Sequence, residues 1–216
     1  MSFDELKVSS IDDVLNALVA DEFFAALSYK NAAIVAQGSS LNECLELFDK
    51  TAEDEYEDHL VKLVNFAQSI GIGIQMNLIE MSKNCTTPAI TVGTAENTEI
   101  LIKKLIDAEL KAIEAYKLAM KNECIREEYP ELINIFADIL CDEREHKKEL
   151  EDVWSSITNL SYPADEHPDW TNYDDEKYMI PIDNEEDEAI FDDVVVDIHE
   201  SSNSSFIVNG IKELFG

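Results

Sequence analysis

The 216-residue chain carries 16 basic and 47 acidic residues, which gives a formal net charge of −31. Such a surface repels nucleic acid and anionic membranes, and it attracts cations or basic proteins. No apolar run approaches the roughly 18 residues of a membrane span, and we expect no signal peptide, so a cytoplasmic, reducing location is predicted. Four scattered cysteines form no C-x-x-C pair, which excludes a zinc ribbon or a rubredoxin-type iron site; Cys44 and Cys141 are predicted to be core residues.

The first predicted element is a helix over residues 11–37. Apolar residues recur there at steps of three and four, and Glu22 lies inside that apolar stripe. Ser9 or Ser10 is the expected N-cap. A glycine followed by two serines ends the helix after residue 37.

A second helical stripe covers residues 41–70 and continues through Glu55 and His59, so both polar residues share its apolar face. Glycines then end the helix. Residues 71–95 are punctuated by Gly and Pro and are predicted to form a long crossover connection, with a short helical turn over 76–81.

Two further helices follow the crossover. One begins at Thr94 or Asn97 and carries Glu109 on its apolar face. The other begins at Pro130, a residue tolerated in the first turn, and carries Glu143-Arg-Glu-His146. The order of helix, short turn, helix, long crossover, helix, short turn, helix predicts an all-α four-helix bundle over residues 1–158.

Residues 159–216 differ in composition from the predicted bundle. From residue 161 onward there are 16 acidic residues and only two basic ones, without a helical period. We predict an acidic, partly extended or disordered C-terminal arm. It includes a possible short strand at 194–196 and ends in an apolar segment, 206–215, that follows a serine-rich linker.

An internal repeat relates the two halves of the predicted bundle. The pattern E-x-x-A-x-x-x-Y-K-x-A begins at Glu22 and recurs at Glu109, an offset of 87 residues. Its tyrosines are Tyr29 and Tyr116, and each copy is followed about one helix later by a carboxylate and a histidine. Two helical hairpins of nearly equal length therefore place these groups at one level of the bundle.

These side chains have the composition of a two-metal site. Iron and manganese accept carboxylate oxygen together with imidazole nitrogen, and four carboxylates balance the charge of two divalent ions. Without metal, four buried carboxylates would be very costly. The predicted ligands are Glu22, Glu55, His59, Glu109, Glu143 and His146, and the expected cofactor is two iron ions, with manganese as the alternative.

The second helix departs from the E-x-x-H spacing of the fourth. Tyr56 stands three residues before His59, so the alternatives are Glu55 with His59, or Glu55 with Asp58 as a substitute ligand. We choose Glu55 and His59, because the offset of 87 relates His59 to His146 and a π-bulge can absorb one extra residue. If Tyr56 faces the metal instead, the second ion is weak or absent.

The first 158 or so residues resemble the ferritin-like di-iron carboxylate superfamily, including bacterioferritin, rubrerythrin and encapsulated ferritin. The resemblance implies metal-ligand roles for Glu22, Glu109, Glu143 and His146. It also implies a tyrosine near the metal, so Tyr29 and Tyr116 are predicted either to bond ligand carboxylates or to supply an electron. The layout of the acidic arm and apolar end is similar to cargo-loading tails of encapsulated ferritins.

Three functions follow from this reading. The first is a di-metal oxidoreductase that uses oxygen or peroxide, as a ferroxidase or a rubrerythrin-like enzyme. The second is a metal-binding protein without turnover, and the third is a structural or cargo protein with a degenerate site. A homodimer, a protein shell and a basic partner of the C-terminal arm are the macromolecular partners considered; nucleic acid and membrane are not expected.

Overall fold

A computed structural model describes residues 1–37, 41–87, 90, 96–160 and 162. The chain divides into two units, Met1–Pro163 and Ala164–Gly216. The predicted short strand at 194–196 and the apolar segment 206–215 lie outside the described residues, as does nearly all of the acidic arm, so these remain predictions. In the described ranges, no helix combines the length and the apolar character needed to cross a membrane.

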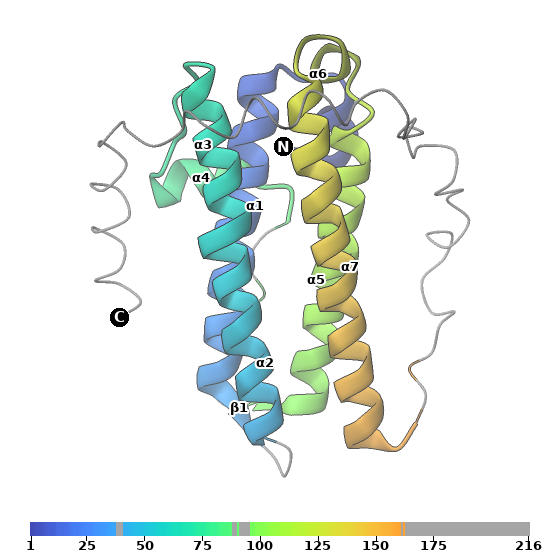
Figure 1. The fold of residues 1–216 in the computed structure, drawn as a ribbon. Coiled ribbons are helices and arrows are strands. Elements are labelled where there is room, and N and C mark those ends of the chain that lie inside the picture. The colour runs from blue at the N-terminus through green and yellow to red at the C-terminus, as the bar shows by residue number, and fades with distance from the viewer. Residues whose placement is uncertain (38–40, 88–89, 91–95, 161, 163–216) are drawn as a thin grey trace, which may run out of the picture. The chain divides into compact units, whose positions relative to one another are not determined.

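Four helical rods form the bundle that the sequence predicts (Figure 1). The second rod is continuous although its winding changes, because Glu53 and Val61 at its junctions both keep right-handed helical backbone angles. α1 packs along this second rod, and α5 packs along α7. The rods are α1 (Ile11–Val35), then α2 (Leu41–Glu53) with η2 (Asp54–Leu60) and α3 (Val61–Ser69), then α5 (Thr98–Ala119), and finally α7 (Pro130–Thr158).

The helix ends follow local capping chemistry. The Ser10 side chain accepts a hydrogen bond from the Asp13 amide at the start of α1, and Asn97 accepts one from the Glu99 amide at the start of α5. Of the alternatives left open by the sequence, Ser10 and Asn97 are therefore the caps. At the other end of α7, Asn159 adopts a left-handed conformation (φ 56°), which terminates the helix.

The crossover contains one short helix, α4 (Leu78–Asn84), slightly later than the predicted turn. Asn77 sets its start by accepting hydrogen bonds from the amides of the second and third residues that follow. Where the crossover meets the bundle, β1 (Ala36–Gln37) pairs in parallel with β2 (Glu96–Asn97). This two-residue pairing was not predicted, because it depends on segments far apart in sequence.

Short helices also flank the bundle at its other connections. η1 (Phe3–Lys7) precedes α1, and α6 (Glu123–Glu128) occupies the link where only a turn was predicted. The buried Asn122 explains α6: its side chain accepts from the Ile125 amide and donates to the carbonyls of Leu6 and Ser9. The core prediction is right for Cys44, which is buried, and wrong for Cys141, which faces outward from α7.

The apolar core is divided into two clusters along the rods. One contains Leu18, Leu63, Phe136 and their neighbours, and the other contains Phe48, Leu105, Trp154 and theirs. On each rod, the predicted metal ligands fall in sequence between residues of one cluster and residues of the other. Apolar layers therefore lie above and below a polar belt.

Candidate metal centre

All six predicted ligands are buried in this polar belt. Their exposed fractions are between 0% and 3%, which is rare for carboxylates unless they are paired or bind a cation. Every rod contributes at least one of them: Glu22 from α1, Glu55 and His59 from η2, Glu109 from α5, and Glu143 and His146 from α7.

A π-helical segment aligns the second rod with the centre. η2 spans Asp54–Leu60, so it contains the four-residue spacing of Glu55 and His59. The wider winding absorbs one residue, and both side chains reach the interior. Tyr56 instead packs partly buried against the apolar cluster, and Asp58 is half exposed and pairs with Lys62 at 2.6 Å. Glu55 therefore occupies the inward position, and neither Tyr56 nor Asp58 replaces it.

Around His59, three carboxylates converge on one ring nitrogen. Its Nδ1 lies 3.1 Å from Glu55 Oε2, 3.3 Å from Glu22 Oε2 and 3.4 Å from Glu143 Oε1. A single nitrogen donates at most one hydrogen, so these contacts cannot all be hydrogen bonds. Oxygen and nitrogen atoms from all four residues lie within 4.8 Å of one another, a grouping that could hold one metal ion.

A second group forms around His146 and shares two members with the first. Nδ1 of His146 lies 3.3 Å from Glu55 Oε1 and 3.9 Å from Glu143 Oε2, and Glu109 completes the set within the same 4.8 Å limit. Glu55 and Glu143 thus present one oxygen to each histidine. The two imidazole rings are 5.6 Å apart between centroids. The two groups therefore share two carboxylates, and each group could hold one cation.

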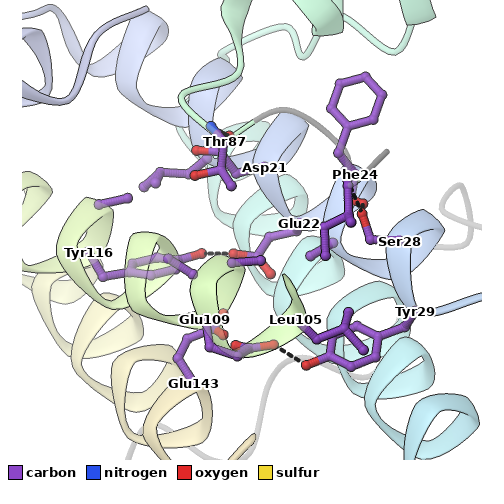
Figure 2. A pocket seen from close by; sticks show the side chains of 16 residues that line it. Asp21, Glu22, Phe24, Ser28, Tyr29, Thr87, Leu105, Glu109, Tyr116 and Glu143 are labelled. Carbon is purple, nitrogen blue, oxygen red and sulfur yellow. Dashed lines mark hydrogen bonds between the residues drawn. The ribbon is translucent and has the colours of Figure 1, made fainter. Parts of the chain in front are cut away.

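The repeat tyrosines bond the two unshared glutamates in a reciprocal pattern. Tyr29 on α1 donates to Glu109 on α5, and Tyr116 on α5 donates to Glu22 on α1 (Figure 2). Burial, together with the charge of the bonded glutamate, raises the pKa of each phenol well above its ordinary value. Both tyrosines therefore keep their protons and hold α1 and α5 in register at the centre.

Burial and repulsion between the carboxylates shift the pKa values of the residues in the centre. Burial, followed by the charges of Glu55 and Glu22, raises the pKa of Glu143 to about 8. Burial also raises the pKa values of Glu55 and Glu109. Although burial lowers the pKa of His146, the contact with Glu55 and its charge outweigh this and raise it to about 9. The metal-free centre consequently holds protons at neutral pH that a cation would displace.

Unpartnered atoms show that these residues fit metal ions. Among the described residues, several buried atoms of the centre have no hydrogen-bond partner, although charged groups lie nearby. Native cores rarely leave buried polar atoms unpaired without a ligand or function to explain them. Mixed oxygen and nitrogen donors of this kind suit iron and manganese. The unpartnered inward atoms are Glu55 Oε1, Glu109 Oε2, both carboxylate oxygens of Glu143 and His146 Nδ1.

Two aspartates that we did not predict lie behind the histidines. Nε2 of His59 is 3.4 Å from Asp142, and Nε2 of His146 is 3.5 Å from Asp54. A carboxylate at this nitrogen favours the tautomer whose Nδ1 is free to bind a metal. The sequence signals them only in part: an aspartate directly precedes both Glu55 and Glu143, but the histidine that each aspartate faces depends on how the rods pack.

These aspartates also line a hollow that reaches the centre from outside. Its volume is about 200 Å³, and its walls are mostly acidic. The histidines form its inner wall, so the hollow connects the protein surface to the metal-binding groups. The lining residues are Lys50, Asp54, Asp58, His59, Asp142, Glu145 and His146.

A third unpredicted aspartate fixes the crossover beside the centre. The buried Asp21 precedes Glu22 and accepts hydrogen bonds from the Thr86 amide (2.8 Å), the Thr86 hydroxyl (2.5 Å) and the Thr87 amide (2.7 Å). Burial raises its pKa to about 7, although the threonine bonds oppose this. The start of the ligand-bearing segment of α1 is thereby tied to the crossover (Figure 2).

Fold and centre together define the class: a four-helix bundle with one long crossover and a carboxylate–histidine centre in its core. Residues 13–160 match the model of the Ferritin family, described as a ferritin-like domain, and the chain belongs to this family. No curated protein matches the chain significantly.

Solved structures agree with this fold assignment. The bacterioferritin-related protein of Bacteroides fragilis, a dodecameric thioferritin, is 20% identical with a TM-score of 0.65, over 73% of this chain and 92% of that one. Dps from Listeria monocytogenes is 12% identical with a TM-score of 0.62, over 71% and 96%. Dps from Thermosynechococcus elongatus is 11% identical with a TM-score of 0.60, over 66% and 88%. At these identities the likeness shows the fold alone.

Proposed function

We propose that this chain is a ferroxidase-type protein that binds two ferrous ions in the bundle core and passes their electrons to dioxygen. The observation that carries the proposal is the pair of four-residue groups that share Glu55 and Glu143. Such sharing would bring two cations close together, as a two-electron reaction requires. Membership of the ferritin-like family adds support.

Each ligand then has a defined place. Glu22 and His59 would hold one ion, Glu109 and His146 would hold the other, and Glu55 and Glu143 would each offer one oxygen to each ion. The iron is the substrate: two ferrous ions give one electron each to dioxygen, which takes up two protons and leaves as hydrogen peroxide, while two ferric ions form. Four carboxylates balance the four positive charges of the ferrous pair.

The remaining residues of the centre position these ligands. Tyr29 and Tyr116 fix the orientation of the two unshared carboxylates through hydrogen bonds, which favours a positioning role over electron supply. Asp54 and Asp142 fix the ring orientation of the histidines. The apolar clusters on either side keep water away and strengthen the electrostatic interactions within the centre.

Ferrous iron reaches the centre through the acidic hollow in this proposal. Asp54, Asp58, Asp142 and Glu145 line that hollow and attract divalent cations, while the inner wall consists of the histidines. Lys50 lies at the same hollow but is paired with Glu149 at 3.0 Å, which draws its charge away from an incoming ion.

The placement of Glu55 bears on the alternative functions. A degenerate site would follow if Tyr56 took the inward position, but Tyr56 packs against the apolar cluster and Glu55 is the buried residue. This supports two half-sites rather than one. Metal binding without turnover differs from the proposal only in its reaction with oxygen, so oxygen consumption separates the two.

The experiment is a metal titration followed by an oxygen assay. Anaerobic titration with ferrous iron is expected to give about two ions per chain, and admission of air should then consume oxygen and yield ferric iron. Glu109→Ala is expected to lose at least one ion, while Glu114→Ala, on the same helix outside the centre, should behave as wild type. Iron bound without oxygen uptake would favour a metal-binding protein, and absence of bound iron would reject the proposal.

We also infer that the chain forms homo-oligomers. All six ligands come from one chain, so the centre does not need a partner, but the Bacteroides fragilis relative is dodecameric. Light scattering on the full-length protein tests the inference, and a monomer at all concentrations would contradict it.

A further inference from the structure

A second cavity reaches the centre from between α1 and α5. Its volume is about 30 Å³, and Thr87 and Ile90 of the crossover form part of its wall. The side chains of Glu22, Glu109 and Glu143 form part of its wall. α1 packs on the second rod and α5 packs on α7, so this cavity and the acidic hollow between η2 and α7 lie on opposite faces of the bundle.

The cavity explains the alanine of the internal repeat, which metal binding leaves unexplained. In each copy of E-x-x-A-x-x-x-Y, the glutamate, the alanine and the tyrosine all line this cavity. Ala25 and Ala112 stand one helical turn after their glutamates, where any larger side chain would fill the space. Ala108 and Ala115 widen the same gap along α5. The repeat thus preserves an opening beside the ligands as well as the ligands themselves.

Most polar groups on the cavity wall already have partners. Asp21 accepts bonds from the crossover, and Ser28 donates to the Phe24 carbonyl while accepting from the Ile90 amide. Both tyrosine hydroxyls donate to glutamates. Among the crossover residues that line the cavity, the Thr87 hydroxyl is buried and unpartnered. Apart from Thr87 and the ligand oxygens at its inner end, the wall offers few unpartnered polar atoms and suits a small apolar molecule.

At the inner end of the cavity, buried ligand atoms lack partners. Glu109 Oε2 and both oxygens of Glu143 have no hydrogen-bond partner, and these residues are 2% and 1% exposed. The space has room for a molecule of about two heavy atoms, since a water-sized particle needs roughly 10–15 Å³. A diatomic molecule that fills this cavity therefore lies against the side chains that would hold the ions.

We propose that dioxygen reaches the centre through the apolar cavity between α1 and α5, separately from ferrous iron. The inference rests on the proposed function, because it assigns a route to the oxidant of that reaction. Ferrous iron requires the charged hollow, whereas dioxygen gains from apolar walls and makes no hydrogen bonds that they would have to satisfy.

Filling the cavity is the kinetic test. Ala112→Val adds two carbons at the wall, and it is expected to raise the oxygen concentration for half-maximal ferrous oxidation about tenfold. Anaerobic binding of ferrous iron should not change, nor should the rate with hydrogen peroxide, which as a polar molecule can use the acidic hollow. Ala33→Val, at a half-buried position on α1 outside the cavity, is the matched control. If Ala112→Val does not fold, Ala25→Val tests the opposite wall.

A second measurement needs no metal and no variant. Dissolved oxygen is paramagnetic, so it speeds the NMR relaxation of methyl groups near the places it occupies. In the metal-free, full-length protein, the methyl signal of Ala115, a buried residue of the cavity wall, is expected to relax faster under oxygen pressure than that of Ala67. Ala67 is fully buried in an apolar cluster but does not line the cavity.

The outcomes separate this inference from the proposed function. Wild-type protein that binds ferrous iron but consumes no oxygen would reject the proposed function, and the relaxation measurement on the metal-free protein would still decide whether oxygen occupies the cavity. Unchanged oxygen dependence in a folded Ala112→Val variant would overturn the route and leave the proposed function intact. Equal relaxation of the Ala67 and Ala115 methyl groups would also overturn the oxygen route.

Discussion

Replacement of Glu143 by glutamine should stabilise the metal-free protein at neutral pH. Burial, followed by the charges of Glu55 and Glu22, raises the pKa of Glu143 from 4.5 to about 8. At pH 7 the folded protein therefore keeps a proton on Glu143 that the unfolded chain releases, and this linkage costs about 3 kcal/mol. Glutamine cannot ionise in either state, so Glu143→Gln should raise the free energy of unfolding by up to that amount.

The gain in free energy of unfolding from Glu143→Gln depends on pH. It is absent below pH 4.5, where both states of the wild type are protonated, and it reaches its full value above about pH 8. Between these limits it grows by about 1.4 kcal/mol for each pH unit. The direction of this pH dependence follows from the raised pKa of Glu143. The folded wild type holds the extra proton, so its free energy of unfolding falls as the pH rises from 4.5 to about 8.

Urea unfolding of the metal-free protein at several pH values measures this gain. Glu53→Gln changes an exposed glutamate of α2 and serves as the control, with little expected change at any pH. With ferrous iron added anaerobically, the wild type should become more stable than Glu143→Gln. The wild type gains the binding energy of two ions, and the variant loses part of it. A metal-free Glu143→Gln protein less stable than wild type at pH 7 would refute the reasoning, since an ionised Glu143 would then be stabilising the core.

Three further predictions follow from the centre and its surroundings. Metal affinity should rise with pH up to about 9, because Glu143 (pKa about 8) and His146 (pKa about 9) lose protons when the metal binds. Calorimetry in buffers of different ionisation enthalpy measures the number of protons released. Tyr29→Phe and Tyr116→Phe should each weaken metal binding about tenfold by releasing one unshared carboxylate, as anaerobic titration would show. Deletion of residues 160–216 should slow ferrous oxidation at low salt but not at high salt, measured by stopped-flow absorbance, because the arm is strongly acidic.

The bundle and its ligand positions were predictable because each depends on local pattern. Apolar periodicity placed all four rods, and the 87-residue offset related Glu22 to Glu109 and His59 to His146. The π-helical winding of η2 was foreseen only as a means of absorbing one residue, since the offset of Glu55 to Glu143 is 88. In the sequence, a π-helical segment shows only as such a one-residue difference between the two repeat offsets.

Features that depend on distant partners were not predictable. Asp21 is an ordinary acidic residue in sequence, and its role arises only because Thr86 and Thr87 fold back onto α1. Asp142 gains its position behind His59 from the packing of α7 against the second rod. Cys141 follows the buried Leu140, and the helical rotation of one residue turns it outward.

Anomalous diffraction at the iron absorption edge, from crystals grown anaerobically with ferrous iron, tests the central claim most directly. We predict two neighbouring peaks in each chain, one beside Glu22 and His59 and the other beside Glu109 and His146, with Glu55 and Glu143 between them. A bundle core without iron, or iron found only among exposed carboxylates, would contradict the account.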